Sequence, residues 1–196
     1  MSIKEEAIKK ARELAVRYQG ELVGCGHCSF AATIDALRSV GIEIVSERLE
    51  NEMFKGLVGL TGGAGNTGVG TCGALTGAGF ALSLAAGVGR KELAQDKRNR
   101  WTPYWYVKKA LGDPWIKRFG GLSCRQTQLK NFGRAWNSHL PEMSKALFEA
   151  ANERGCRQPH LCTIANAAAM AVEAIFELRE NPEDLTYLKE MYEPQG

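Results

Sequence analysis

The chain has 196 residues, of which 44% are hydrophobic and 24% charged, the composition of a globular domain and not of a disordered chain. Lysine and arginine number 25 against 22 aspartates and glutamates, an excess too small to indicate nucleic-acid binding. No apolar run approaches the roughly 20 residues that span a bilayer, and the charged N-terminus is no signal peptide. We therefore expect one cytoplasmic domain over residues 1–196, without membrane or nucleic-acid partners.

Helical periodicity and cap residues predict a series of helices along the whole chain. A short apolar run at 42–45 has no partner of similar length, so we predict no β-strand. The fold class expected is all-α, a single-domain helical bundle with cysteine-bearing turns and a glycine-rich loop. The expected helices are 3–18, 28–40, 47–57, 70–86, one or two within 90–111, 113–120, one starting at Cys124, 141–154, 161–180 and a last one ending near Tyr192.

The segment from Gly59 to Gly87 begins with a run of glycines, presents Cys72, and continues as an apolar stretch of alanine, leucine and glycine. It lacks the Gly-Lys-Ser/Thr ending of a phosphate-binding loop and follows no predicted strand, which argues against a nucleotide. A flexible surface loop is the simpler alternative. A cysteine directly after the glycines favours a wall that lets backbone approach a sulfur site, with N–H groups facing it.

Six cysteines in a reducing compartment indicate metal ligation or redox chemistry, although free cysteines are also common as small buried hydrophobes. Cys25 and Cys28 form a C-x-x-C pair. A thioredoxin-like dithiol needs a preceding strand, and the preceding segment is predicted to be helical. A metal site would draw further ligands from Cys72, Cys124, Cys156 and Cys162. Ser29 follows Cys28, so this is no c-type haem site. We expect His27 and His160 to face solvent.

The pattern resembles the C_GCAxxG_C_C family of small redox-active proteins and the non-haem part of split-Soret cytochromes c, which carries an iron–sulfur centre. The resemblance rests on Cys28, the block Cys72-Gly-Ala-Leu-Thr-Gly77, Ser123-Cys124-Arg125, and a cysteine heading an alanine-rich helix. It covers roughly residues 10–180. It implies cluster ligands at Cys28, Cys72, Cys124 and Cys162, with Cys25 an extra cysteine and Cys156 a competitor for the fourth position. The expected surroundings of the cofactor are Gly70, Gly73, Gly77 and Arg125.

Three functions remain open from the sequence. The first is an iron–sulfur electron-transfer protein with a [4Fe–4S] or [2Fe–2S] cluster and no c-type haem. The second is a thiol–disulfide oxidoreductase using Cys25 and Cys28, and the third is a structural zinc protein. The basic and aromatic segment 97–119 is expected to bury its rings and solvate its charges, or to dock a redox partner protein. A homodimer is expected from base rates.

Overall fold

The computed structural model describes residues 1–191, and every regular element within them is a helix. The only strand-like pairing in that part of the chain is an isolated bridge between Thr71 and Ser123. The all-α prediction is therefore confirmed. Tyr192, where the last helix was expected to end, lies outside the described residues. No helix in the described part of the chain is long and apolar enough to cross a membrane.

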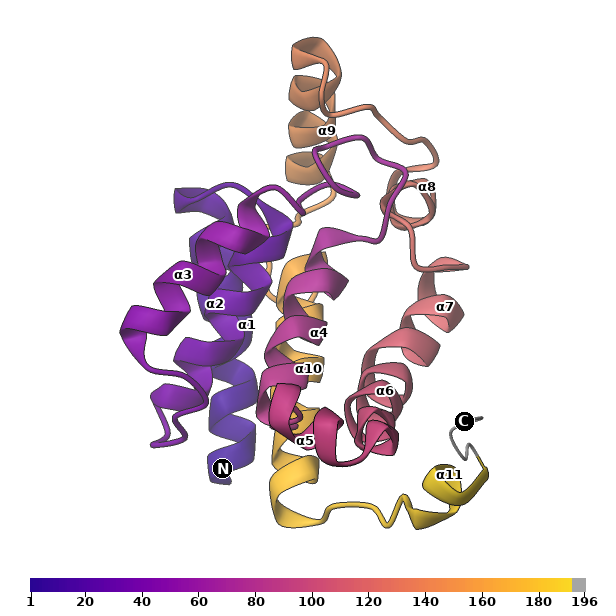
Figure 1. The fold of residues 1–196 in the computed structure, drawn as a ribbon. Helices are drawn as coiled ribbons and strands as arrows, with labels where there is room; N and C mark the ends of the chain where they lie inside the picture. Colours follow the sequence, from indigo (N-terminus) through magenta and orange to yellow (C-terminus); the bar gives the residue numbers. More distant parts are fainter. Residues whose placement is uncertain (192–196) are drawn as a thin grey trace.

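Four helices form the centre of the fold (Figure 1), with α1 against α2 and α10, and α4 against α2 and α10. Their alanines allow close approach, because Ala7, Ala11 and Ala15 of α1 and a row of alanines on α10 are buried. α3 packs on the outer side of α2. The bounds of these helices are α1 Ile3–Glu21, α2 Cys25–Arg38, α3 Glu47–Val58, α4 Gly73–Ala85 and α10 Thr163–Glu180.

The contact between α2 and α4 depends on a glycine. A Cβ atom added at Gly77 would fall inside 3.0 Å of the carbonyl oxygen of Gly26 and of Ser29 Oγ. Only a hydrogen fits there, so the two backbones come nearer than side chains would allow. Gly77 therefore sets the spacing of the helices that carry Cys72 and the Cys25–Cys28 pair.

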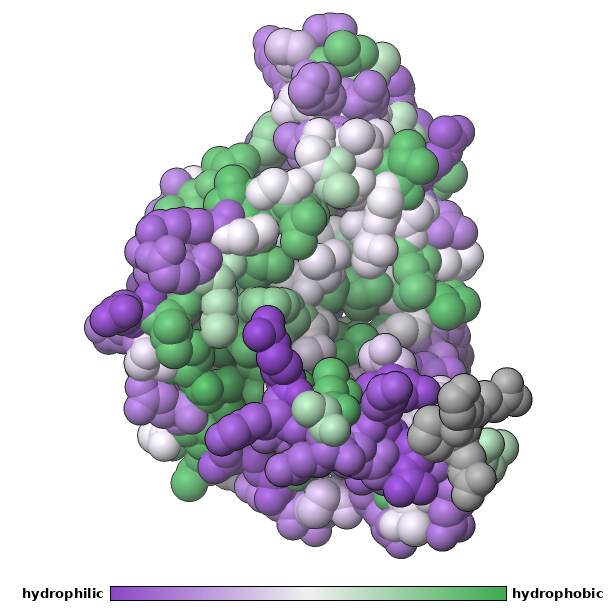
Figure 2. Space-filling model, in the orientation of Figure 1, coloured by the Kyte–Doolittle hydropathy of each residue, from purple (hydrophilic) through white to green (hydrophobic). Residues whose placement is uncertain are grey.

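A second group of shorter helices covers one side of this centre (Figure 1). Trp115, Tyr106 and Phe119 are almost fully buried, so these three rings turn inward as expected, whereas Tyr104 of the same segment is 56% exposed. Hydrophilic residues gather over α5 (Figure 2). The bounds are α5 Arg90–Gln95, a 3₁₀ turn Lys97–Arg100, α6 Trp101–Val107, a π turn Lys108–Gly112, α7 Asp113–Phe119, α8 Cys124–Phe132, α9 Pro141–Glu153 and α11 Thr186–Met191.

Three predicted boundaries were wrong in a way that matters for the cysteines. α1 continues through Gly20 to Glu21, and α2 begins at Cys25, three residues before the expected start. α4 begins at Gly73, so that Cys72 is its N-cap and lies outside the helix. As a result the first turn of α2 carries both members of the C-x-x-C pair.

A cysteine-lined cavity as candidate functional site

Five of the six cysteines line one cavity of about 560 Å³ at the end of the bundle where α9 and the loop before α4 lie (Figure 1). The wall includes the last turns of α1, the starts of α2 and α10, and one side of α8 and α9. Segments more than a hundred residues apart thus present thiols to the same space. The cysteines concerned are Cys25, Cys72, Cys124, Cys156 and Cys162.

Four of these cysteines stand at helix N-termini. Cys25 and Cys124 are the first residues of α2 and α8, and Cys72 and Cys162 are the N-caps of α4 and α10. The first N–H groups of a helix have no partner within it, and the helix dipole favours negative charge there. Each thiol is therefore placed where a thiolate, or an anionic group bound to it, finds backbone donors.

The bridge between Thr71 and Ser123 brings Cys72 and Cys124 together. The N–H of Cys72 donates to Leu122 O (2.8 Å), and the N–H of Cys124 donates to Gly70 O (2.9 Å). Both thiols line the same cavity, and the nearby thiol of Cys124 adds to the raised pKa of Cys72. A pairing of only a few residues thus joins two cysteines that are 52 positions apart in the sequence.

The glycine run folds as a left-handed turn beside Cys25 and Cys124. Five consecutive residues, Gly62 to Asn66, all have positive φ between 59° and 81°. Ala64 holds this conformation at a cost of about 1–2 kcal/mol, whereas asparagine tolerates it and glycine adopts it freely. The turn directs the N–H of Gly62 to Cys25 Sγ (3.5 Å). A Cβ at Gly63 would meet Cys124 Cβ at 3.1 Å, so the turn lies directly on that cysteine.

Burial dominates the ionisation of these thiols. Removal from water raises the pKa of Cys28 and of Cys72 to about 12, with neighbouring thiols adding to the effect. Burial likewise raises the pKa of Cys25, against the N–H groups of Gly62, Gly73 and Ala74. The pKa of Cys124 and of Cys162 is raised for the same reason. Without a bound cation the buried thiols are thus protonated at neutral pH, and the helix N-termini only moderate this.

Polar side chains also contact the thiols. Gln128 Nε2 donates to Cys124 Sγ (3.2 Å), and Gln128 Oε1 accepts from the N–H of Trp136 (2.8 Å), so the amide is fixed at both ends. Arg154 Nη1 lies 3.8 Å from Cys156 Sγ. The charge of Arg12 partly offsets the effect of burial on the pKa of Cys162. Nothing in the sequence pattern distinguished Gln128, Arg12 or Arg154, because their role depends on chain segments that meet only in the fold.

The remaining expected site residues are absent from the described wall of the cavity. Cys28 is fully buried behind it, near enough to Cys25 and Cys162 for their charges to raise its pKa. A Cβ at Gly73 would meet Cys25 Sγ, and one at Gly70 would meet Gly63 backbone. Arg125 is exposed and absent from the described wall.

The two histidines next to cysteines differ from each other. His160 is exposed, as expected. The expectation for His27 was wrong: it is 4% exposed and packs on Phe54, with ring centroids 4.8 Å apart. Burial lowers the pKa of His27, and within residues 1–191 its Nδ1 has no hydrogen-bond partner. The extension of α2 back to Cys25 places His27 in the first turn of the helix, which turns its ring toward α3.

No three His, Cys, Asp or Glu side chains among residues 1–191 are already grouped to hold a single metal ion. A tetrahedral zinc site with Zn–S bonds of about 2.3 Å requires its sulfurs within roughly 4 Å of one another. The thiols are instead distributed around the cavity wall. The side chains of the wall that commonly ligate metal ions are all thiols.

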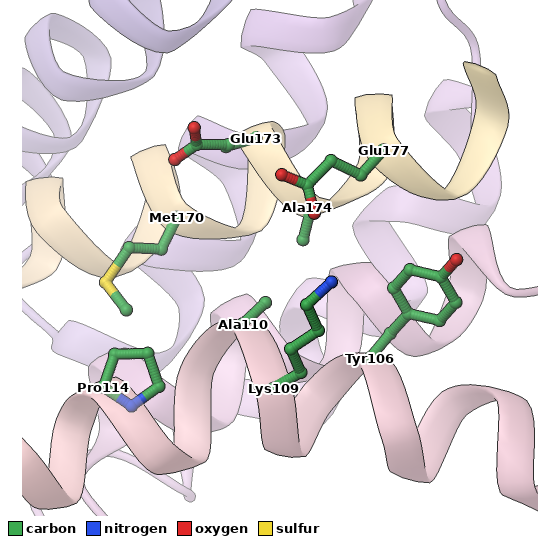
Figure 3. Close-up of a pocket in the computed structure, with 8 residues that line it drawn as sticks. All are labelled: Tyr106, Lys109, Ala110, Pro114, Met170, Glu173, Ala174 and Glu177. Carbon is green, nitrogen blue, oxygen red and sulfur yellow. The ribbon is translucent and has the colours of Figure 1, made fainter. Parts of the chain in front are cut away.

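A second pocket, of about 380 Å³, lies between α10 and the segment from α6 to α7 (Figure 3). Glu173 and Glu177 of α10 face Lys109 and Tyr106 across it, and no cysteine lines it. Its charges already have partners in the chain, since Lys4 pairs with both glutamates and Lys109 pairs with Glu183. We assign this pocket to the packing of the two helical layers.

A family model described as "Putative redox-active protein (C_GCAxxG_C_C)" matches residues 23–174, most of the chain. The matched range includes all six cysteines and the glycine loop. Neither the curated proteins nor the solved structures yielded a match.

Proposed function

Because the chain belongs to the C_GCAxxG_C_C family of redox-active proteins, we propose that it binds an iron–sulfur cluster in the cysteine-lined cavity and transfers electrons. The observation that carries the proposal is the convergence of Cys25, Cys72, Cys124 and Cys162 from four helix N-termini on one hollow. Four thiolates suffice for a [2Fe–2S] or a [4Fe–4S] cluster. A bound cluster would accept and release single electrons.

The residues around the thiols have separate tasks in this proposal. Cys72 and Cys124, held by the Thr71–Ser123 bridge, and Cys162 at the start of α10 would supply three ligands. The fourth would be Cys25 or Cys28, which lie on one turn of α2. The N–H groups of Gly62 and of the helix starts would donate to sulfur and so favour the more reduced, more negative state.

Burial supports the cluster over a free dithiol. A thiol–disulfide enzyme needs an accessible thiol of low pKa, whereas burial raises the pKa of both Cys25 and Cys28. Coordination to a metal removes the thiol proton outright, so the same buried thiols become thiolates once iron is bound. The dithiol alternative predicts rapid alkylation of Cys25 in a protein without iron.

The test is anaerobic purification of the full chain, with iron and acid-labile sulfide measured per chain and EPR recorded after reduction. We expect stoichiometric iron and sulfide and a cluster signal. Cys72→Ala and Cys124→Ala should each lose most of the iron. Ser144→Ala alters the same cavity wall without removing a thiol and should keep it.

Two further variants identify the fourth ligand. If Cys25 is a ligand, Cys25→Ser loses iron and Cys28→Ser retains it, and the reverse result assigns the position to Cys28. A colourless protein that stays free of iron and sulfide after reconstitution refutes the cluster. Zinc in place of iron, with no sulfide, would favour the structural zinc alternative.

A further inference from the structure

The cavity offers more than a place for sulfur ligands. Its volume of about 560 Å³ lies in the middle of the range typical of small-molecule sites. α9 contributes Leu147, Phe148 and Ala151 to the wall, yet no residue of α9 is buried, and Phe148 is 42% exposed. The apolar side of this helix therefore faces the hollow instead of a packed core. When a ligand covers apolar surface of this kind, the surface is removed from water, and this favours binding.

The polar part of the wall selects the charge of such a ligand. Among the described residues of the wall, Arg157 is the only one with a charged side chain, and there is no carboxylate, lysine or histidine. Arg157 Nε donates to Asn152 Oδ1 (3.2 Å), which orients the guanidinium at the end of α1 near Gly20. A negatively charged group can receive the remaining N–H donors of an arginine fork.

Neutral hydrogen-bonding groups complete the wall. The side chain of Thr61 also lines the space, and its buried Oγ1 has no hydrogen-bond partner among the described residues. The side chains of Gln19, Asn66 and Asn131 also line the space. An apolar surface with a few placed polar groups and one cation is the usual composition of a site for a small organic molecule.

We propose that the cavity binds a small organic molecule with an apolar body and one negatively charged group, the body against α9 and the charge on Arg157. This site goes beyond the cluster and does not require it, because its contacts come from the end of α1, from α9 and from Arg157 in the segment between α9 and α10. In a protein that carries the cluster, the same position would place the molecule beside the thiols.

The test uses three probes of the same shape and different charge: naphthoate, naphthamide and naphthylmethylammonium. Each is titrated into the anaerobically purified full chain, before and after removal of iron, and followed by probe fluorescence and by NMR shifts of Thr61 and Asn131. We expect one saturable site, with affinity in the order naphthoate, naphthamide, naphthylmethylammonium. Binding with and without iron separates this site from the fate of the cluster proposal.

Two variants locate the contacts. Arg157→Gln should weaken naphthoate about fivefold, as for an ion pair near the surface, and leave naphthamide unchanged. Phe148→Ala should weaken both probes. Lys145→Gln removes a charge from an exposed position of α9 that pairs with Glu149, and should change neither. Lack of saturation, equal binding of the cationic probe, or an unchanged charge preference in Arg157→Gln would overturn the proposal.

Discussion

Replacing Gly73 by alanine tests how closely the first turn of α4 approaches the thiols. The added Cβ would lie inside 3.0 Å of Cys25 Sγ and 3.2 Å from the backbone nitrogen of Gly26. Ordinary contact begins at 3.4 Å, so the sulfur must withdraw by more than 0.4 Å. The sulfur then moves away from the N–H of Gly62, which donates a hydrogen bond to it at 3.5 Å.

The cost follows from packing energetics. Overpacking of a tight interior costs about 1–3 kcal/mol, and the higher helix propensity of alanine returns up to about 1 kcal/mol. We expect Gly73→Ala to lower the free energy of unfolding by about 1–2 kcal/mol, a fall in Tm of roughly 2–8 °C for a chain of this size. With Cys25 displaced, bound iron per chain should also fall.

Gly79→Ala is the matched control on the same helix. Its Cβ would meet Val107 and Leu111 side chains at 3.6 and 3.7 Å, which are ordinary contacts. We expect it to be neutral or stabilising by up to about 1 kcal/mol. Thermal unfolding followed by circular dichroism and iron analysis compare the two variants. If Gly73→Ala matches Gly79→Ala in both Tm and iron content, the close approach of α4 to Cys25 is not a constraint on the site.

Two more predictions follow from the same packing. Gly77→Ala forces a Cβ into the carbonyl of Gly26, which is backbone and cannot rotate away, so it should cost about 3 kcal/mol or more in chemical denaturation; a loss below that of Gly73→Ala contradicts this. Burial of Tyr18, together with the hydrogen bond that its hydroxyl donates to Asp35, raises the pKa of Tyr18 from 10.0 to about 12. The folded state then holds a proton that the unfolded state releases, so stability falls between about pH 10 and 12. Tyr18→Phe should flatten that fall in urea unfolding, and an equal pH slope would refute the assignment.

Much of the helical framework follows from local sequence. The repeat of apolar residues in α1 and α10, and the glycines that follow α7 and α8 in left-handed conformation, act over a few residues, so the sequence predicts those helices. The sequence likewise predicted that Cys124 and Cys162 lie at the starts of helices. The start of α2 at Cys25 was not predicted, because Gly24 has no side chain to cap the helix. Because the predicted start was three residues too late, the burial of His27 was not foreseen either.

The sequence alone determined three features: an all-helical fold, six thiols, and a glycine run without the lysine of a phosphate loop. The tertiary structure decided which of these segments come into contact. The Thr71–Ser123 bridge, the left-handed turn over Cys124, the position of Cys28 behind the wall, and the cavity side of α9 all arise from contacts between distant segments. Local propensity carries no information about such contacts, because their energy comes from surfaces that exist only after the helices have packed.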